Sequence, residues 1–552
     1  LMASNKIVIY QIFTRLYGNR NITRKEGGTI EENGCGKMND FTPTTLKNIR
    51  DMGVSHIWYT GIIRHATQTD YSAYGIPKNH PAIVKGLAGS PYAITDYYDV
   101  DPDLASDVDM RMQEFEQLIE RTHKADMKVI IDFVPNHVAR QYHSICKPEG
   151  VKDLGEEDNP QMGFDPQNNF YYCPGQRFTP YFDLYHGEDE PYIEEPAKAT
   201  GNDCFHNAPG INDWYETAKL NYGVDYYAGR VGHFTPIPNT WSKMTDILLF
   251  WAKKGVDGFR CDMAEMVPAA FWQWATDKVK FAYPQMIFIG EVYNPAEYRN
   301  YLAAGFDYLY DKVGMYDTLR EVMRGYQSTS AITGAWQATD DIRDRMLYFL
   351  ENHDEQRVAS SFFAGDAQKG VPALAVSALL QQNPLMIYFG QEYGERGMDK
   401  EGFSGNDGRT TIFDYWSVDT IVRAAERKLT AEEKQLKALY DKIINIATTE
   451  KAVINGASFD LMYVNGRYNH EYAFIRKAGA EVLLVVANFA ASNQAIGITI
   501  PGHAFDFLNL KEKNAQATDL ISGEKQKLSL KRDEAVVVNV EANSAVVLKF
   551  KA

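Results

Sequence analysis

The chain has 552 residues and a formal net charge of −16, with 45% hydrophobic and 24% charged residues. This length allows roughly two to four domains, and one of them can be large if it is a barrel. The acidic balance argues against binding nucleic acid or an anionic membrane through a basic face. The sequence holds no apolar run of about 18 residues, so we expect no membrane-spanning helix.

Aromatic residues make up 13% of the chain, which suits stacking on sugar rings and equally suits an ordinary large core. Five cysteines are too few and too dispersed for a disulfide scaffold. Cys173 and Cys204 share a loop-rich region, and the sequence leaves their pairing open. No signal peptide is visible at Leu1, so the compartment stays open between cytoplasm, periplasm and exterior. The oligomeric state is also left open.

Apolar, β-rich runs alternate with amphipathic helical patterns along most of the chain. Helical periodicity is found at residues 42–52, 110–125 and 241–254. The intervening runs are nearly continuous in apolar residues, which is typical of buried parallel strands. We predict eight such strands, at residues 7–13, 54–59, 128–134, 256–261, 286–290, 306–309, 346–350 and 385–389.

Eight strand–helix units predict an α/β fold of the (β/α)8 TIM-barrel type, formed by residues 1–137 and 225–450. Residues 138–224 are rich in Gly, Pro, Asn, Asp and Tyr and show no strong periodicity. A structureless loop of that length is improbable, so we expect a small inserted domain after the third strand. Short β runs separated by turns predict a C-terminal antiparallel β-sandwich at residues 451–552.

Polar and charged side chains follow several of the predicted strands. Any one of them, taken singly, is an ordinary solvated strand end, but the carboxyl ends of barrel strands meet on one face, where barrel active sites lie. The residues that we expect to meet there are Asp132, Asn136 and His137 after the third strand, Arg260 and Asp262 at the fourth, Glu291 at the fifth, and His353 and Asp354 at the seventh.

Crowded carboxylates suit the cleavage of a glycosidic bond. The leaving oxygen must be protonated, and the anomeric carbon, which develops positive charge, needs a nearby carboxylate. Two carboxyl groups with separated pKa values can perform both tasks. Arg260 would keep Asp262 ionised by pairing with it, while His137 and His353 are suited to bonding sugar hydroxyls.

The four segments that contain these residues, after the third, fourth, fifth and seventh predicted strands, resemble the four signature segments of the α-amylase family of glycoside hydrolases (family 13 type). The whole chain also follows the domain layout of that family. The resemblance implies a retaining mechanism with Asp262 as nucleophile, Glu291 as general acid/base and Asp354 as a transition-state-stabilising carboxylate. It further implies sugar contacts by Tyr92, His137, Arg260, His353 and Arg409, and structural support by Asp96 and Asp132.

The implied reaction is hydrolysis of α-1,4-glucosidic bonds in starch, glycogen or maltooligosaccharides. A transglycosylase of the 4-α-glucanotransferase or maltosyltransferase type, or an α-glucosidase, would use the same residues, since these activities differ in what accepts the glycosyl group. Ser90 stands where typical endo-acting members carry histidine, so endo and exo action, chain length and branch tolerance stay open. Retention of Asp262, Glu291 and Asp354 speaks against an inactive sugar-binding relative.

The implied chemistry needs no cofactor, but many relatives carry a central structural calcium ion. Asn136 matches the usual side-chain ligand of that ion. Glu265 and Met266 stand where calcium-binding members commonly have lysine and histidine. The ligand set is therefore incomplete, and the resemblance leaves the calcium site open.

Overall fold

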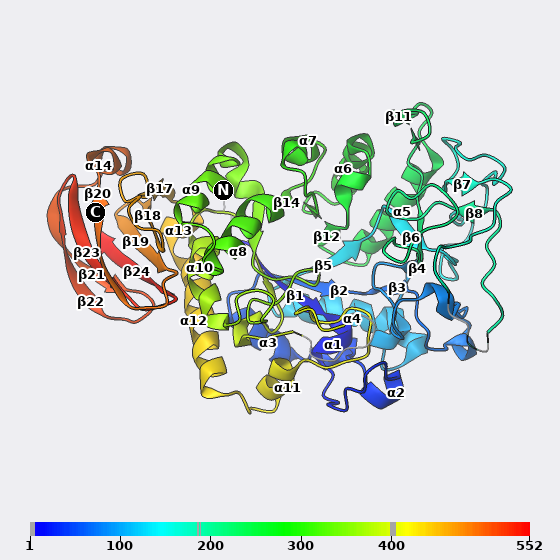
Figure 1. Cartoon of the computed structure of the whole chain (residues 1–552), viewed down its shortest axis with the longest axis horizontal. Coiled ribbons are helices and arrows are strands. Elements are labelled where there is room, and N and C mark those ends of the chain that lie inside the picture. Colours follow the sequence, from blue (N-terminus) through cyan, green and yellow to red (C-terminus); the bar gives the residue numbers. More distant parts are fainter. Residues whose placement is uncertain (1–5, 185–186, 188, 398–404) are drawn as a thin grey trace.

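The computed structural model describes residues 6–184, 187, 189–397 and 405–552. The molecule is elongated, with the barrel in the middle, the segment after the third barrel strand at one end and the C-terminal β-rich region at the other (Figure 1). Eight parallel strands close into a barrel, which confirms the predicted fold class. They are β1 (Val8–Phe13), β2 (His56–Thr60), β5 (Lys128–Phe133), β12 (Gly258–Cys261), β13 (Ile287–Gly290), β14 (Tyr308–Tyr310), β15 (Met346–Phe349) and β16 (Leu385–Tyr388).

The strand pairing shows that the sheet is closed into a ring. β1 pairs in parallel with both β2 and β16, so the first and last strands complete the ring. Amphipathic helices cover the outside, among them α3 (Pro43–Asp51), α4 (Arg111–Lys124), α5 (Asn239–Lys253), α6 (Ala269–Ala282) and α12 (Ala431–Thr449). One helix, α10 (Gly370–Leu379), is buried along its whole length because it is apolar all round and contacts α12, β15 and the C-terminal strands.

The inserted segment, residues 138–224, leaves and rejoins the barrel at one place. β6 (His137–Ala139) pairs antiparallel with β9 (Thr217–Lys219), so the two ends of the segment lie side by side at the mouth of the barrel. β7 (Tyr172–Cys173) and β8 (Ala197–Lys198) form another short pair within it. Cys173 and Cys204 are free thiols, so no bridge joins them.

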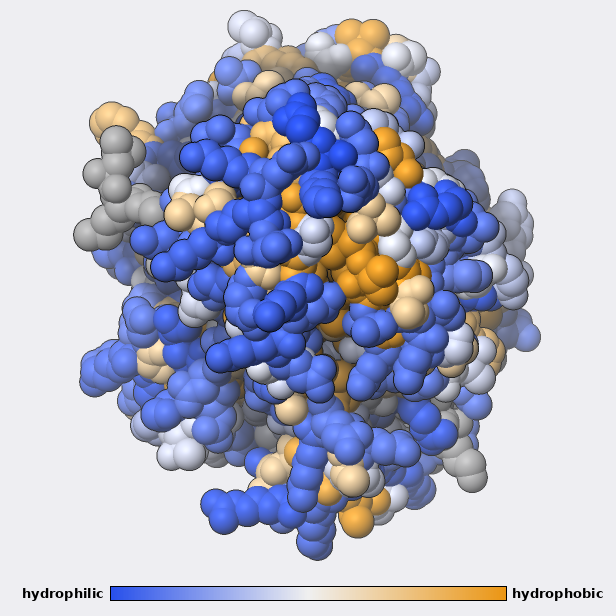
Figure 2. Space-filling view, turned by 90° about the vertical axis from the view of Figure 1, so that its left-hand side faces the viewer, coloured by the Kyte–Doolittle hydropathy of each residue, from blue (hydrophilic) through white to orange (hydrophobic). Residues whose placement is uncertain are grey.

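The C-terminal region is antiparallel, as predicted. A six-stranded sheet has the order β17 (Ala457–Asp460), β18 (Glu471–Ala478), β19 (Glu481–Asn488), β24 (Ser544–Lys551), β21 (Lys513–Asp519) and β22 (Lys525–Leu530), and β20 (Gln494–Ile500) pairs with β23 (Glu534–Val540). The strands β17, β21 and β22 and the helix α14 (Gly502–Leu508) were not predicted from the sequence. Polar side chains cover most of this end of the molecule around a smaller apolar area (Figure 2).

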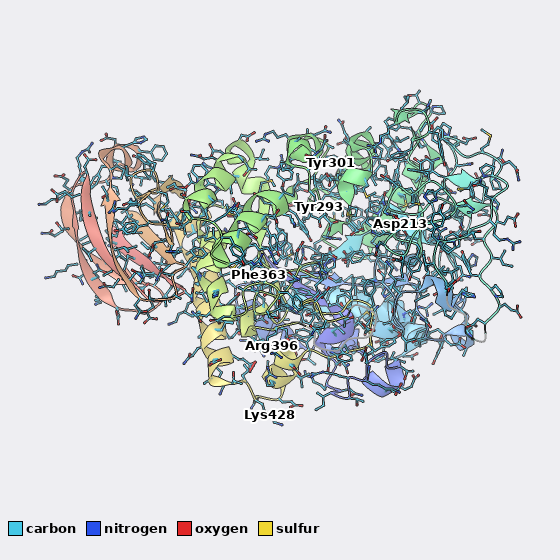
Figure 3. The ribbon with its side chains drawn as sticks, in the orientation of Figure 1. Asp213, Tyr293, Tyr301, Phe363, Arg396 and Lys428 are labelled. Atoms are coloured by element: carbon cyan, nitrogen blue, oxygen red, sulfur yellow. The ribbon has the colours of Figure 1, made fainter. Side chains whose placement is uncertain are left out.

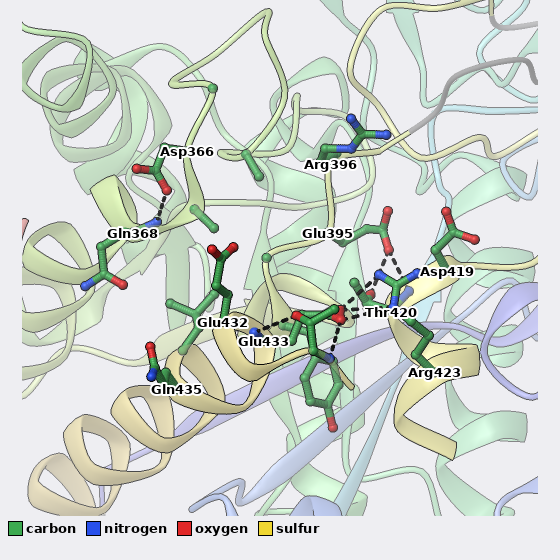
Figure 4. A pocket seen from close by; sticks show the side chains of 17 residues that line it. Asp366, Gln368, Glu395, Arg396, Asp419, Thr420, Arg423, Glu432, Glu433 and Gln435 are labelled. Atoms are coloured by element: carbon green, nitrogen blue, oxygen red, sulfur yellow. Dashed lines mark hydrogen bonds and ion pairs between the residues drawn. The ribbon is translucent and has the colours of Figure 1, made fainter. Parts of the chain in front are cut away.

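A cavity of about 790 Å³ lies between the loop after β16 and the helices α11 (Asp419–Ala425) and α12 (Figure 4). Arg423 on α11 pairs with Glu433 on α12 at 2.9 Å, and Glu395 accepts hydrogen bonds from the backbone and hydroxyl of Thr420. The described lining residues include none that the sequence places in the active site. These contacts hold the two helices together.

Within the described ranges, no helix is both long and apolar enough to cross a lipid bilayer.

Arg476 joins the C-terminal sheet to the rest of the molecule. Its side chain on β18 is 1% exposed and donates to the carbonyl oxygens of Leu379, Val453 and Gly456 at 2.8, 2.9 and 3.1 Å. These carbonyls belong to the ends of α10 and α13 (Lys451–Ile454) and the residues just after α13. With a longer bond of 3.4 Å to the carbonyl of Ala457, one buried guanidinium satisfies four backbone groups at the junction.

We predict that Arg476→Met lowers the free energy of unfolding by about 3 kcal/mol, because buried carbonyls lose charged donors. Differential scanning calorimetry should show a lower Tm for this variant. Arg532→Met, at a side chain that is 43% exposed in the same region, is the control and should keep the wild-type Tm. Equal Tm values for the two variants would show that Arg476 does not stabilise the junction.

Candidate active site

The carboxyl ends of the barrel strands bring most of the predicted residues into one cluster. Asp132 lies on β5 and Arg260 on β12, while Asp262 and Glu291 come directly after β12 and β13. The paired strands keep this register, since Arg260 is the partner of Asp132 in β5 and of Ile289 in β13. The predicted site is thus assembled by neighbouring parallel strands, and its buried members are Asp132, His137, Arg260, Asp262, Glu291 and His353.

Arg260 is the centre of this cluster. Its guanidinium lies 2.8 Å from Asp262 Oδ1 and 3.4 Å from Asp132 Oδ1, and it also contacts Glu291 Oε2. Its Nε donates to the hydroxyl of Tyr310 at 3.1 Å. The side chain is only 1% exposed, so the surrounding carboxyl groups must compensate a charge that is removed from water.

Glu291 is held so that its neutral form is favoured. Burial raises its pKa to about 8, and the nearby Asp262 and Asp354 act in the same direction, while Arg260 and a backbone N–H partly oppose them. That N–H belongs to Met263 and donates to Glu291 Oε1 at 3.1 Å. At neutral pH the group is therefore mostly protonated and able to give up a proton.

The other two carboxyl groups differ from Glu291 in their partners. Burial also raises the pKa of Asp262, but Arg260 opposes the shift and donates to the carboxylate at 2.8 Å. The two groups share one guanidinium and titrate as a pair, and we place the proton of the pair on Glu291. For Asp354, burial opposes ionisation, but His353, Arg260 and Arg409 outweigh it and lower its pKa to about 2.

The aromatic rings of Tyr92, His353 and Trp58 lie beside the carboxyl groups. Tyr92 stacks on His353 with ring centroids 5.0 Å apart and an interplanar angle of 23°. The Tyr92 hydroxyl donates to Asp132 Oδ1 at 3.0 Å, and Trp58 Nε1 donates to Asp132 Oδ2 at 2.9 Å. Gln11 Nε2 lies 2.8 Å from His353 Nδ1, which fixes the imidazole from within the barrel. Asp132 therefore positions both Tyr92 and Arg260.

His137 and Asn136 lie where the inserted segment meets the barrel. The His137 ring is 5.2 Å from the ring of Trp214 in the inserted segment. Burial, with Lys219 nearby, lowers the pKa of His137 to about 3, so this imidazole is neutral. Asn136 donates to the carbonyl of Gly201 at 2.8 Å, and its amide oxygen accepts from Lys219 Nζ.

Two predicted residues have no contact with Arg260 and act on the backbone around the site. Asp96 is fully buried and accepts from the backbone N–H groups of Ile145 and Cys146 at 2.8 and 3.0 Å, so it anchors the start of the inserted segment. Arg409 is 46% exposed and donates to the backbone carbonyl of Asp354 at 2.6 Å. Asp96 thus supports the insertion, and Arg409 holds the segment that carries Asp354.

Several contributors to the site lie outside the strand ends that the sequence pattern singles out. Gln11, Trp58 and Tyr310 lie within β1, β2 and β14, where they read as ordinary core residues. Glu265 accepts from the backbone N–H groups of Tyr293 and Asn294 at 3.0 and 3.1 Å, and so fixes the loop after Glu291. Figure 3 places Tyr293 at the barrel and Asp213 in the inserted segment.

Residues 12–448 match the family model of the alpha amylase catalytic domain. The chain is 25% identical over 390 residues to Alpha-amylase 3 of Dictyoglomus thermophilum, covering 66% of this chain and 68% of that protein. It is 24% identical over 541 residues to Alpha-amylase MalA of Haloarcula japonica, covering 96% of this chain and 60% of that protein. The structure of a maltogenic alpha-amylase, AmyB from Thermotoga neapolitana, covers 100% of both chains with a TM-score of 0.65 at 19% identity.

A closed parallel barrel with carboxyl groups gathered around one arginine at its carboxyl end is the arrangement of a barrel enzyme, whose active site lies on that face. The family match over most of the chain makes the assignment specific: the chain belongs to the α-amylase family, and it is an enzyme of the amylase type. It spans about 60% of the length of Alpha-amylase MalA and 57% of Neopullulanase 2 of Thermoactinomyces vulgaris.

The raised pKa of Glu291 predicts a specific dependence of stability on pH. Between its ordinary pKa of 4.5 and about 8, the unfolded chain has released this proton while the folded chain keeps it. The stability contributed by Glu291 is therefore full below about pH 4.5 and is lost as the pH rises towards 8. Glu291→Gln cannot ionise, so its Tm relative to wild type should rise across this window.

Thermal unfolding monitored by circular dichroism across this pH range would check the effect. Glu120→Gln, at a side chain that is 66% exposed on α4, is the matched control and should track the wild-type curve. A constant difference in Tm between Glu291→Gln and wild type would mean that Glu291 is not held protonated.

Proposed function

We propose that the chain is a retaining glycosidase that cleaves α-1,4-glucosidic bonds in starch, glycogen or maltooligosaccharides. One observation carries the proposal: the buried guanidinium of Arg260 contacts both Asp262 and Glu291, while burial raises the pKa of Glu291 to about 8. A proton donor and an ionised carboxylate at one buried cation are the pair that double displacement needs. We expect carboxyl groups about 5–5.5 Å apart, as retention requires.

In the first step, Glu291 transfers its proton to the glycosidic oxygen, and the bond between this oxygen and the anomeric carbon breaks. The Asp262 carboxylate forms a new bond to the anomeric carbon, which gives a covalent glycosyl ester. The leaving chain departs with the proton. Glu291 becomes ionised at this point, and its contact with Arg260 stabilises the new negative charge.

In the second step, the ionised Glu291 takes a proton from water, and the water oxygen attacks the anomeric carbon. The ester bond to Asp262 breaks, so both carboxyl groups return to their starting states and the anomeric configuration is retained. If a sugar hydroxyl takes the place of water, the same residues perform glycosyl transfer. No cofactor takes part in either step.

The surrounding residues provide the sugar site next to the scissile bond. We assign Asp354, whose pKa is lowered to about 2, to binding sugar hydroxyls and stabilising the positive charge of the transition state. Tyr92 presents its ring to the sugar, while His137 and His353 provide hydrogen bonds. Arg409, whose side chain is 46% exposed, contacts the backbone of Asp354. The inserted segment adds Trp214 beside His137.

The substrate class is supported by the names of the relatives. These include alpha-amylases, a neopullulanase and cyclomaltodextrin glucanotransferases such as that of Geobacillus stearothermophilus, which is 22% identical over 508 residues. An α-linked glucose chain is the substrate that these names share. Hydrolysis and transfer differ in the acceptor, so product analysis must separate them.

We predict that Asp262→Asn lowers kcat on maltoheptaose by about 10⁴-fold or more, because the covalent step loses its nucleophile. Asp257→Asn is the matched control, since Asp257 lies before the other end of β12, where it contacts His123 at 2.7 Å. Products are monitored over time by chain length and by reducing ends.

Shorter sugars with rising reducing ends would identify a hydrolase, whereas longer sugars with constant reducing ends would identify a glucanotransferase. An Asp262→Asn variant that is as active as Asp257→Asn would overturn the assignment of the nucleophile. Failure of the wild type on maltoheptaose and on other α-glucosides would leave a sugar-binding protein.

We also predict that kcat/KM of the wild type declines on the alkaline side with an apparent pKa near 8, because Glu291 must be protonated in the first step. A pH–rate profile on maltoheptaose would measure this limb. A profile that stays flat well above pH 8 would contradict the role of Glu291 as the acid.

A further inference from the structure

Lys219 forms an ion pair with Asp203 at the mouth of the barrel, and the lysine side chain is buried. Its side chain is 2% exposed, and its Nζ lies 2.8 Å from Asp203 Oδ1 and also contacts Asn136 Oδ1. The face of the Tyr226 ring lies 5.5 Å from the same atom. Because an ammonium group has three donors and no acceptor, it suits a site lined by a carboxylate, an amide oxygen and an aromatic face.

This site coincides with the residue that marks the central calcium ion in relatives. Calcium takes six to eight oxygen ligands at about 2.3–2.6 Å. Here the Asn136 oxygen is occupied by Lys219, and the Asn136 amide nitrogen donates to Gly201. The carboxylate of Glu265 already accepts hydrogen bonds from two backbone N–H groups. The buried ammonium group of Lys219 would in addition repel a divalent cation. The residues present do not fit a calcium ion.

Within the part of the chain that the structure describes, one other group of three side chains has metal-ligand spacing: Asp96, Asp99 and Cys146. Arg64 lies 3.2 Å from Asp96 and 3.0 Å from Asp99, and Arg111 lies 2.8 Å from Asp99. Two arginines therefore already compensate these carboxylates, and the group offers no replacement for the Asn136 site.

We propose that the Lys219 ammonium takes the place of a structural calcium ion and fastens the inserted segment to the barrel without any metal. Asn136 precedes β6 and belongs to the barrel, whereas Asp203 and Lys219, the latter on β9, both lie within the inserted segment. His137 is the register partner of Lys219 in the β6–β9 pair. The internal cation therefore also holds the strand that carries His137.

The wild-type protein provides the first test, and its readouts are independent of activity. Protein equilibrated with Ca²⁺ and then desalted should contain no stoichiometric calcium by elemental analysis. Its Tm should be the same in Ca²⁺ and in EDTA. One bound calcium ion per chain, or a fall in Tm with EDTA, would overturn the proposal. Neither result bears on the proposed glycosidase activity.

A substitution provides the second test. Lys219→Ser removes the ammonium and leaves the oxygens of Asn136 and Asp203 in place, so we expect Tm to fall by about 5 °C. Added Ca²⁺ should restore part of this loss, while Mg²⁺, which needs a smaller octahedral site, should not. Lys198→Met is the matched control, since this lysine of the inserted segment lies over the Phe170 ring, and Ca²⁺ should not change its Tm.

An unchanged Tm in Lys219→Ser would show that the ammonium group does not hold the inserted segment to the barrel. A decrease in Tm that Ca²⁺ does not reverse would show that the oxygens of Asn136 and Asp203 do not form a cation site. Either result would overturn the proposal. If Lys219→Ser fails to fold, the calcium content and EDTA response of the wild type still decide it.

Discussion

The buried guanidinium of Arg260 imposes a constraint on everything around it. A charge that is 1% exposed is tolerable only with compensating groups, and three carboxyl groups and a phenol hydroxyl provide them. One cation cannot hold three neighbouring carboxylates fully ionised without strong repulsion. Burial, together with the charges of Asp262 and Asp354, raises the pKa of Glu291 to about 8, which leaves a proton donor next to Asp262, the residue that we propose as the nucleophile.

The barrel and the inserted segment make this constraint possible. Arg260 lies on β12, which pairs in parallel with β5, where Asp132 lies, and with β13, which ends just before Glu291. The strand pairing therefore sets the spacing between Arg260 and these two carboxyl groups. The β6–β9 pair returns the insertion to the barrel mouth, where Lys219 fastens Asn136 to Asp203. The segment also brings Trp214 beside His137.

The sequence was sufficient for features that repeat or stand at strand ends. The eight apolar runs predicted the barrel, and the carboxylates that follow them include those that meet around Arg260. β21 and β22 were missed because alternate positions carry exposed Lys, Gln and Ser, which removes the apolar run. The Lys219 contact could not be predicted, because Asn136 and Lys219 are 83 residues apart and meet only through an irregular insertion.

The central claim is that Asp262 forms the covalent bond while Glu291 acts as acid and base. A fluorinated α-glucosyl fluoride, whose glycosyl ester breaks down slowly, would trap that intermediate, and mass spectrometry of proteolytic peptides would locate it. We predict one added fluoroglucosyl group on the peptide that contains Asp262, which is lost in Asp262→Asn. A label on another residue, or rapid turnover with inverted products and no label, would contradict the account.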